Sequence, residues 1–165
     1  MTDHVLRCTL HLAVPRARAF AFFADAENLA RITPPELAFR IRTPRPIARR
    51  EGALIDYTIG LHGIPMNWRT RITRWIPNEE FTDEQLRGPY AKWVHCHRFR
   101  DDGHGGTIID DEVLYRLPFG VIGNLVHPIV RMQLRRIFGY RSESVRRLLG
   151  DQASPSESEA VEFAY

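Results

Sequence analysis

The amino-terminal part of the chain joins an alternating segment to a helical one. Apolar and polar side chains alternate over residues 5–14, which predicts a half-buried strand. Pro15 follows at a position where a helix can begin, and a segment rich in Ala and Phe continues to Asp25. A second short helix is expected over residues 26–31, because the Thr-Pro-Pro run at 33–35 ends it.

Six further extended segments follow, and turns rich in Gly, Pro, Asp and Asn separate them. They are expected at residues 36–43, 53–61, 66–76, 80–87, 91–100 and 106–117. Short connections between consecutive strands favour an antiparallel meander. Together with the first strand, the pattern predicts seven strands.

The last third of the chain changes to a helical period. Between residues 124 and 149 apolar side chains recur every three or four positions, which predicts a helix of about 26 residues and about 39 Å. Pro128 is expected near its first turn, where the missing N–H group costs little. Residues 151–165 are acidic and polar and are expected to be a disordered tail, although Val161, Phe163 and Tyr165 could dock on the domain.

Composition limits the class of protein. A chain of 165 residues, 44% of them hydrophobic and 26% charged, fits a single globular domain, expected at residues 1–150. There is no apolar run of membrane-spanning length, and the amino terminus carries charges where a signal peptide needs apolar residues. Cys8 and Cys96 are too few for a disulfide scaffold, so a reducing cytoplasm is the expected location.

The basic charge of the chain does not predict nucleic-acid binding. The formal net charge is +3, and it rises to +7 for residues 1–150 because four acidic residues lie beyond Gly150. Lys92 is the only lysine, and no basic block of five or six residues is present. An arginine excess of this kind is typical of a GC-rich genome, so no nucleic-acid partner is expected.

The order of elements and four stretches of sequence resemble a known family. The stretches are AVPRARAFAFFADAENLARITPP, GALIDYTIGLHGIPMNWRTRITRW, GPYAKWVHCHRF and GTIIDDEVLYRLPFG. They are similar to the START-like, or SRPBCC, superfamily, and in particular to bacterial single-domain members near the polyketide cyclases and dehydrases. The resemblance implies an α+β helix-grip fold, in which a curved antiparallel sheet wraps the long carboxy-terminal helix. It also implies that an internal cavity holds a hydrophobic or amphipathic small molecule such as a lipid, polyketide or isoprenoid-like compound.

Strand alternation predicts which side chains face that cavity. In WVHCHRF, the aromatic residues Trp93 and Phe99 share a face with both histidines, which marks this face as the inner one. The same rule applies to the neighbouring strands and to the apolar stripe of the long helix. The predicted ligand-binding residues are Tyr57, Trp68, Phe81, Asp83, Gln85, Trp93, His95, His97, Val113, Tyr115, Leu134, Ile137 and Arg141. The tryptophans among them could stack on a flat ligand or simply fill the core.

The His95-x-His97 pair allows three interpretations. It could supply two ligands to a metal ion, with Asp83, Asp111 or His62 as the third. In a cyclase or dehydrase type of enzyme, His95, His97 and Asp111 could act as general acid and base. Alternatively, these histidines and aspartates could pair as hydrogen-bonded wall residues of a binding pocket. Because the sequence specifies no third metal ligand, it predicts no tightly bound metal, and no cofactor is expected.

Arg141 departs from the pattern of the long helix. Its helical angle places it near Leu134, inside the apolar stripe, which predicts a buried or half-buried ion pair facing the pocket. Asp83, Asp111, Glu112 or a ligand carboxylate could be the partner. Alternatively, the guanidinium group could reach water at the mouth of the cavity.

The other arginines of this helix form a basic outer face. This face could touch an anionic membrane during lipid delivery, or it could simply be solvated. A carrier, an enzyme and a partner-binding module with an incidental cavity all fit the sequence, which does not specify the oligomeric state.

Overall fold

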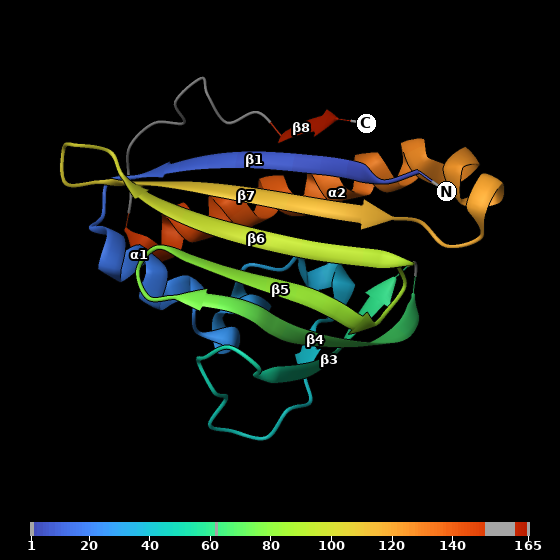
Figure 1. The fold of residues 1–165 in the computed structure, drawn as a ribbon, viewed down its shortest axis with the longest axis horizontal. Coiled ribbons are helices and arrows are strands. Elements are labelled where there is room, and N and C mark those ends of the chain that lie inside the picture. The colour runs from blue at the N-terminus through green and yellow to red at the C-terminus, as the bar shows by residue number, and fades with distance from the viewer. Residues whose placement is uncertain (1, 62, 151–160, 165) are drawn as a thin grey trace.

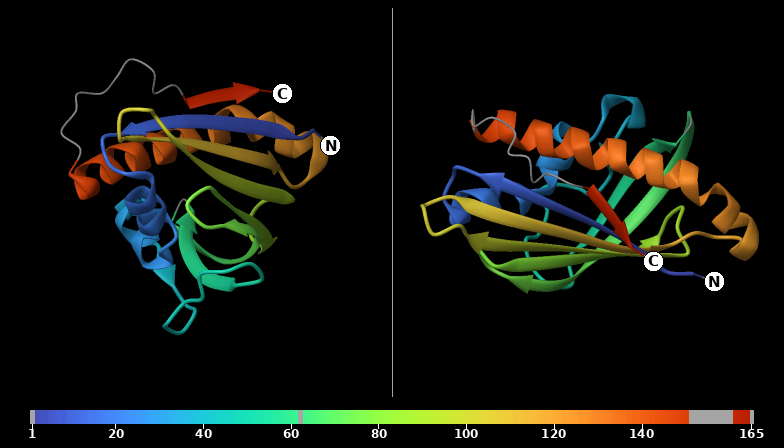
Figure 2. Two further views of the ribbon diagram at one scale, coloured as in Figure 1. Left: turned by 60° about the vertical axis from the view of Figure 1, so that its left-hand side comes forward. Right: turned by 90° about the horizontal axis from the view of Figure 1, so that it is seen from above.

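The computed structural model describes residues 2–61, 63–150 and 161–164. One curved antiparallel sheet wraps around a long helix, so the expected α+β helix-grip fold is present (Figure 1, Figure 2). The helices are α1 (Arg16–Phe23) and α2 (Gly120–Leu149), with 3-10 turns η1 (Ala26–Arg31) and η2 (Pro35–Leu37). The strands are β1 (His4–Leu12), β2 (Arg40–Ile41), β3 (Leu54–Leu61), β4 (Ile64–Ile76), β5 (Glu80–Arg87), β6 (Lys92–Asp101), β7 (Thr107–Arg116) and β8 (Val161–Ala164).

The strands are arranged in the order β2-β3-β4-β5-β6-β7-β1-β8. Burial alternates strictly along β7, as expected for a strand with one face on the core. Across the three central strands Asp83 pairs with His95, and His97 pairs with both Phe81 and Asp111. This register brings the acidic and imidazole side chains of three strands to one place on the concave face.

The core lies between the concave face of the sheet and the helices. At the end near α1, Phe20 and Phe23 pack against Phe81 and Phe99 with ring centroids 5.2–5.9 Å apart. Asp25 caps η1 by accepting a hydrogen bond from the backbone N–H of Glu27, so the chain turns sharply after α1. A second apolar cluster joins Trp68, Trp93, Leu134 and Phe138, among others. The space between the two clusters holds the candidate site.

Two expected boundaries are wrong. The strand expected over residues 36–43 is only β2, because Pro35 begins the turn η2 and Ala38 adopts a left-handed conformation with φ 43°. The long helix begins at Gly120, four residues earlier than expected, after the chain turns at Phe119 with φ 65°. Pro128 therefore lies in the helix interior rather than near the first turn, and one backbone hydrogen bond is lost there.

The expected count of seven strands is also wrong, because the described part of the chain contains eight. The eighth strand comes from the acidic tail, where Val161–Ala164 pairs antiparallel with β1. Phe163 packs on the side of α2 under the guanidinium groups of Arg131 and Arg135. Disorder was expected over this segment, but alternating apolar residues and the free edge of β1 give it a partner. Residues 151–160 and Tyr165 lie outside the described residues.

None of the described helices is both long and apolar enough to cross a membrane.

Candidate functional site

A cavity of about 180 Å³ lies between the concave face of the sheet and α2. Its wall is mostly apolar and aromatic, with contributions from α1, η1, β3, β4, β5, β6 and α2. Ten of the thirteen predicted ligand-binding residues line it, namely Tyr57, Trp68, Phe81, Asp83, Trp93, His95, His97, Leu134, Ile137 and Arg141. Strand alternation therefore identified the correct face of the sheet.

Three predicted lining residues lie outside the cavity wall. Val113 and Tyr115 are fully buried in β7, where they belong to one apolar cluster with Leu134 and Phe138 of α2. The hydroxyl group of Tyr115 lies 2.9 Å from Nε2 of His127 on that helix. Gln85 donates from its amide group to the backbone carbonyl of Tyr90, so it fixes the following turn instead. All three residues were predicted on the right face of the sheet, but their side chains do not line the cavity.

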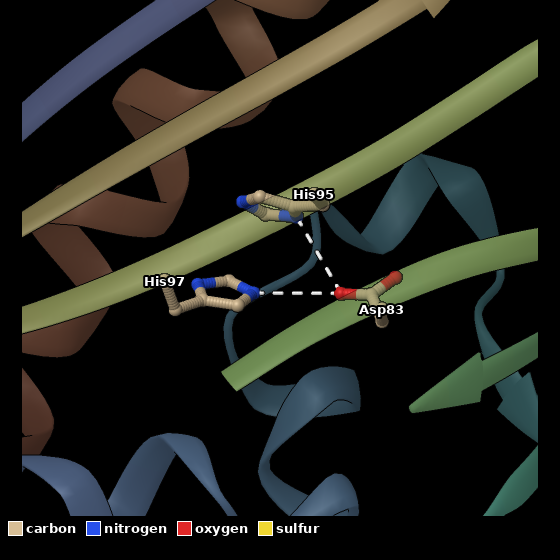
Figure 3. A group of neighbouring side chains, drawn as sticks. All are labelled: Asp83, His95 and His97. Carbon is tan, nitrogen blue, oxygen red and sulfur yellow. Dashed lines mark ion pairs between the residues drawn. The ribbon is translucent and has the colours of Figure 1, made fainter. Parts of the chain in front are cut away.

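Five charged or titratable side chains meet at one end of the cavity, and we call Asp83, His95, His97, Asp111 and Arg141 the charged cluster. Both imidazole rings direct one nitrogen toward Oδ2 of Asp83, from His97 Nε2 at 3.5 Å and from His95 Nδ1 at 3.9 Å (Figure 3). The rings lie side by side, with their centroids 3.8 Å apart. His62, the other candidate metal ligand, lies outside the described residues.

Asp111 and Arg141 form the back of this cluster. The Oδ1 atom of Asp111 lies 2.5 Å from His97 Nδ1 and 3.6 Å from His95 Nε2. Nε of Arg141 lies 3.8 Å from Oδ2 of Asp111, and its guanidinium group stands 5.1 Å from the ring centre of Phe23. The predicted half-buried ion pair facing the pocket is confirmed, with Asp111 as its partner.

The cluster sets the protonation states of its own members. Burial raises the pKa of Asp111, but the charges of His97 and Arg141 outweigh it and hold that pKa well below its usual range. Burial lowers the pKa of His97, but the charge and hydrogen bond of Asp111 raise it above its usual value. For His95, burial and the charge of His97 lower the pKa to about 4. His97 is therefore the histidine that holds a proton more strongly, and His95 is neutral at neutral pH.

Asp83 is held in the same way from the other side. Burial raises its pKa, but hydrogen bonding to His97 and the charges of both histidines lower it overall. The Thr70 hydroxyl group lies 3.1 Å from Asp83 Oδ1 and 3.0 Å from the backbone carbonyl oxygen of Glu84, and it shares its one proton between these two acceptors. With both aspartates ionised, His97 and Arg141 balance two negative charges with two positive ones. The cluster is neutral as a whole when His97 is protonated and His95 is neutral.

Three buried polar atoms of the wall make no hydrogen bond to the described residues, namely Trp68 Nε1, His95 Nε2 and Arg141 Nε. The last two lie 3.6 Å and 3.8 Å from oxygens of Asp111, so Trp68 Nε1 is the one without a nearby carboxylate. A buried donor without an acceptor is costly, and such groups are rare in folded proteins. Trp68 also lines the cavity, so a molecule bound there could supply the acceptor.

A shallow hollow at the surface continues the cavity outward. Leu37, Gln133 and Ile137 line both, and Ile129 and Met132 of α2 lie on the rim of the hollow. Large apolar side chains stand exposed along this part of the helix, and we call them the mouth patch: Ile122, Leu125, Val126, Ile129 and Met132. Arg136 at the same rim forms an exposed ion pair with Glu36 at 2.7 Å.

The sequence comparison gives one family. Residues 12–138 match the model of the family described as polyketide cyclase / dehydrase and lipid transport. The chain belongs to this family. A search of the curated proteins gives no match.

Solved structures share the fold of the family at low sequence identity. The aromatase/cyclase Zhui from Streptomyces sp. R1128 superposes with a TM-score of 0.71 at 14% identity, over 93% of this chain and 100% of that chain. A START superfamily protein from Mycobacterium smegmatis gives 0.67 at 15% identity, over 88% and 99%. Norcoclaurine synthase from Thalictrum flavum, solved with dopamine and hydroxybenzaldehyde, gives 0.66 at 12% identity, over 93% and 90%. At such identities the likeness shows the fold alone.

Some residues of the site were missed at the level of the sequence. Thr70, which orients Asp83, lies two positions from Trp68 and shares its inward face, so alternation along residues 66–76 contained the signal. Phe23, which contacts Arg141, comes from α1. Since no periodicity links α1 to the last helix, nothing in the sequence could predict the contact between Phe23 and Arg141.

Proposed function

We propose that the protein binds an amphipathic small molecule, with an apolar body in the cavity and an oxygen acceptor on the indole of Trp68. The unpartnered Trp68 Nε1 is the observation that carries the proposal, because it calls for an acceptor that the described chain does not supply. The aromatic wall supports an apolar body, and the family includes proteins of lipid transport. The proposed ligand-binding domain is residues 1–150.

The size of the cavity limits the part of the ligand that enters it. An apolar cavity of about 150 Å³ holds a benzene-sized molecule, so 180 Å³ suits one or two rings or a short acyl segment. A longer ligand would extend through the hollow between Leu37 and Ile137. The ligand classes that fit are therefore ring compounds of polyketide or isoprenoid type and single-chain lipids.

A matched pair of substitutions on β3 tests the proposal. Ile55 is buried and lines the cavity, whereas the adjacent Leu54 points to solvent. Ile55→Trp should fill the cavity and weaken binding of a polarity-sensitive apolar dye at least tenfold, while Leu54→Trp leaves binding unchanged. Native mass spectrometry of the freshly purified protein should show a bound small molecule in the wild type and in Leu54→Trp. Equal dye affinity in both variants would contradict the proposal.

A second candidate is an enzyme of the cyclase or dehydrase type, with His95, His97 and Asp111 as acid and base groups. The observation in its favour is that two histidines with pKa values shifted in opposite directions, His95 down and His97 up, stand side by side at the cavity wall. In this case His95→Gln should retain ligand binding but lose turnover. A carrier would keep its full function in this variant.

The delivery route is part of the proposal. Residues 117–142 contain no acidic residue and, apart from the half-buried Arg141, three arginines, and the mouth patch adds exposed apolar area beside the hollow. Such a surface suits transient contact with an anionic membrane, where a lipid-like ligand could pass through the mouth. Both cysteines are free and buried, in line with a proposed cytoplasmic location.

A further inference from the structure

We propose that Asp83, His95 and His97 bind a divalent transition-metal ion whose open coordination positions face the cavity. Each side chain offers one ligand atom, and these atoms lie within 4.8 Å of one another. The sequence predicts no tightly bound metal because it specifies no third ligand for the two histidines. The register of β5 against β6 supplies that ligand as Asp83.

The separations fit a shared ion better than direct hydrogen bonds. His97 Nε2 and His95 Nδ1 lie 3.5 Å and 3.9 Å from the same oxygen of Asp83 (Figure 3). Good hydrogen bonds between such atoms measure about 2.7–3.2 Å. Two ligand atoms about 2.1 Å from a tetrahedral ion lie about 3.4 Å apart. The two imidazole nitrogens lie within 4.8 Å of each other, so side-chain rotations that bring them closer would place all three atoms at coordination distance.

The groups behind the three ligands orient them toward this point. Asp111 Oδ1 faces the outer nitrogens of both rings, at 2.5 Å from His97 Nδ1 and 3.6 Å from His95 Nε2. The Thr70 hydroxyl group holds the outer oxygen of Asp83 at 3.1 Å. Metal-binding histidines almost always have a carboxylate or carbonyl partner on the second nitrogen, and metal-binding carboxylates are likewise hydrogen-bonded. The site has this second layer of hydrogen bonds for His97 and Asp83, and for His95 it has the Asp111 carboxylate at 3.6 Å without a hydrogen bond.

Charge and ligand type narrow the identity of the ion. Asp83 and Asp111 carry two negative charges, and Arg141 is the only permanently charged cation of the cluster. With neutral imidazole ligands the cluster would therefore accept a further positive charge. Two imidazoles and one carboxylate favour zinc, iron, cobalt or nickel over magnesium and calcium. Three protein ligands leave at least one coordination position open.

The open coordination position of the ion would be available to the proposed ligand. All three metal ligands line the cavity, so an oxygen of a bound molecule could reach the ion. A Lewis acid there would fix or polarise a carbonyl or hydroxyl oxygen. This use of the ion rests on the proposed ligand-binding function, whereas the metal site itself does not.

Titration of the full chain with Co²⁺ and Zn²⁺, after treatment with EDTA and desalting, tests the site. We expect one ion per chain, with visible absorption bands of Co²⁺ bound to nitrogen and oxygen ligands. Asp83→Asn and His95→Gln should weaken binding at least a hundredfold. Thr70→Val, which keeps every charge and ligand, should weaken it about tenfold to a hundredfold. His104→Gln changes an exposed histidine outside the cavity and should leave binding unchanged.

The outcomes separate the metal site from the proposed function. Absence of a stoichiometric Co²⁺ complex, or equal affinity in His95→Gln and the wild type, would overturn the metal site. Circular dichroism shows whether each variant is folded, and Thr70→Val keeps the test decisive if a ligand variant unfolds. The apolar dye is titrated against the same proteins. Dye binding without metal binding overturns only the metal site, and metal binding without dye binding overturns only the proposed function.

Discussion

The two ends of the cavity reverse the usual distribution of side chains. At the inner end, the charged cluster is buried, with side-chain exposures from 3% for His97 to 18% for Asp83. At the outer end, large apolar side chains of the mouth patch stand in solvent, such as Leu125 at 75% and Met132 at 69%. Proteins ordinarily bury the apolar groups and expose the charged ones.

Both the buried charges at the inner end and the exposed apolar side chains at the outer end are unfavourable for stability. Buried charges are tolerated at the inner end because each has a partner of opposite sign. The apolar residues of the mouth patch have no comparable compensation within the described chain. A buried charged group and an exposed apolar surface are both associated with binding, one with a small molecule and the other with a partner surface. The following predictions test whether the two ends behave differently.

The largest effect is expected from removing the one permanent cation at the inner end. Arg141→Ala leaves Asp111 with His97 as its only close cation and should lower the free energy of unfolding by about 3 kcal/mol or more. Arg141→Met should cost less, because its side chain keeps the packing against Phe23. Urea unfolding followed by tryptophan fluorescence gives both values.

Arg136→Ala at the outer end is the matched control. Its ion pair with Glu36 is exposed, so its loss should change the free energy of unfolding by less than about 1 kcal/mol. If Arg141→Ala and Arg136→Ala cost the same, the charged cluster contributes no more than an ordinary surface pair.

The second effect is a pH dependence that comes from His95. In the metal-free protein its folded pKa is about 4, below the ordinary value near 6.5. Between these values the unfolded chain binds a proton that the folded chain does not. The free energy of unfolding should therefore fall as pH drops from 6.5 to 4, with a slope of up to about 1.4 kcal/mol per pH unit.

His97 does not produce this slope, because its pKa is raised. Below pH 6.5 it is protonated in both states, and its contribution is lost only as pH rises through its folded pKa. Urea unfolding in EDTA at several pH values should give a flatter dependence for His95→Gln than for the wild type. The pKa of His127 is lowered by burial, so a smaller slope of the same sign remains in both proteins. Identical slopes would show that His95 takes up its proton equally in both states.

A smaller effect is expected from the indole of Trp68. Trp68→Phe removes a buried donor without a partner, so the folded protein should be nearly as stable as the wild type. The affinity for an oxygen-bearing ligand recovered from the protein should fall about fivefold to tenfold. Affinity for a hydrocarbon of similar size should stay nearly constant. An equal loss for both compounds would mean that the ring is needed for its area rather than for its N–H group.

The sequence predicts which face of a strand or helix a side chain lies on better than it predicts whether that side chain reaches the cavity. Alternation along WVHCHRF placed both histidines inside, and helical angle placed Arg141 beside them, and the structure agrees. The register that joins His97 to Asp111 depends on the turn between β6 and β7, which single-strand patterns do not contain. Tyr115 was placed in the cavity because alternation gives the direction of a side chain but not what packs over it.

The carboxy-terminal tail shows what composition alone does not predict. Its composition predicts disorder, yet the alternation of Val161 and Phe163 suits the open edge of β1. Composition averages over a segment, whereas pairing needs only a few residues with a free edge nearby. The mouth patch was missed for a related reason. Its side chains lie on a different face of α2 from the buried stripe of Leu134 and Val145, and periodicity does not show that the described chain leaves that face uncovered.

The smallest effect on stability, and the clearest test of the outer end, is expected from the mouth patch. Ile129→Ser and Met132→Ser remove side chains that are 54% and 69% exposed, so each should change the free energy of unfolding by less than about 0.5 kcal/mol. If the patch meets membranes, the double variant should bind vesicles with 30% anionic lipid at least fivefold more weakly in co-sedimentation. Leu86→Ser on β5, a comparably exposed apolar residue, is the control and should bind like the wild type. Added salt should weaken wild-type binding, because the arginines supply part of the attraction. Sedimentation velocity tests the alternative that the mouth patch is a dimer interface. If the wild type is a dimer and the double variant is a monomer, the patch binds a second copy of this chain rather than a membrane.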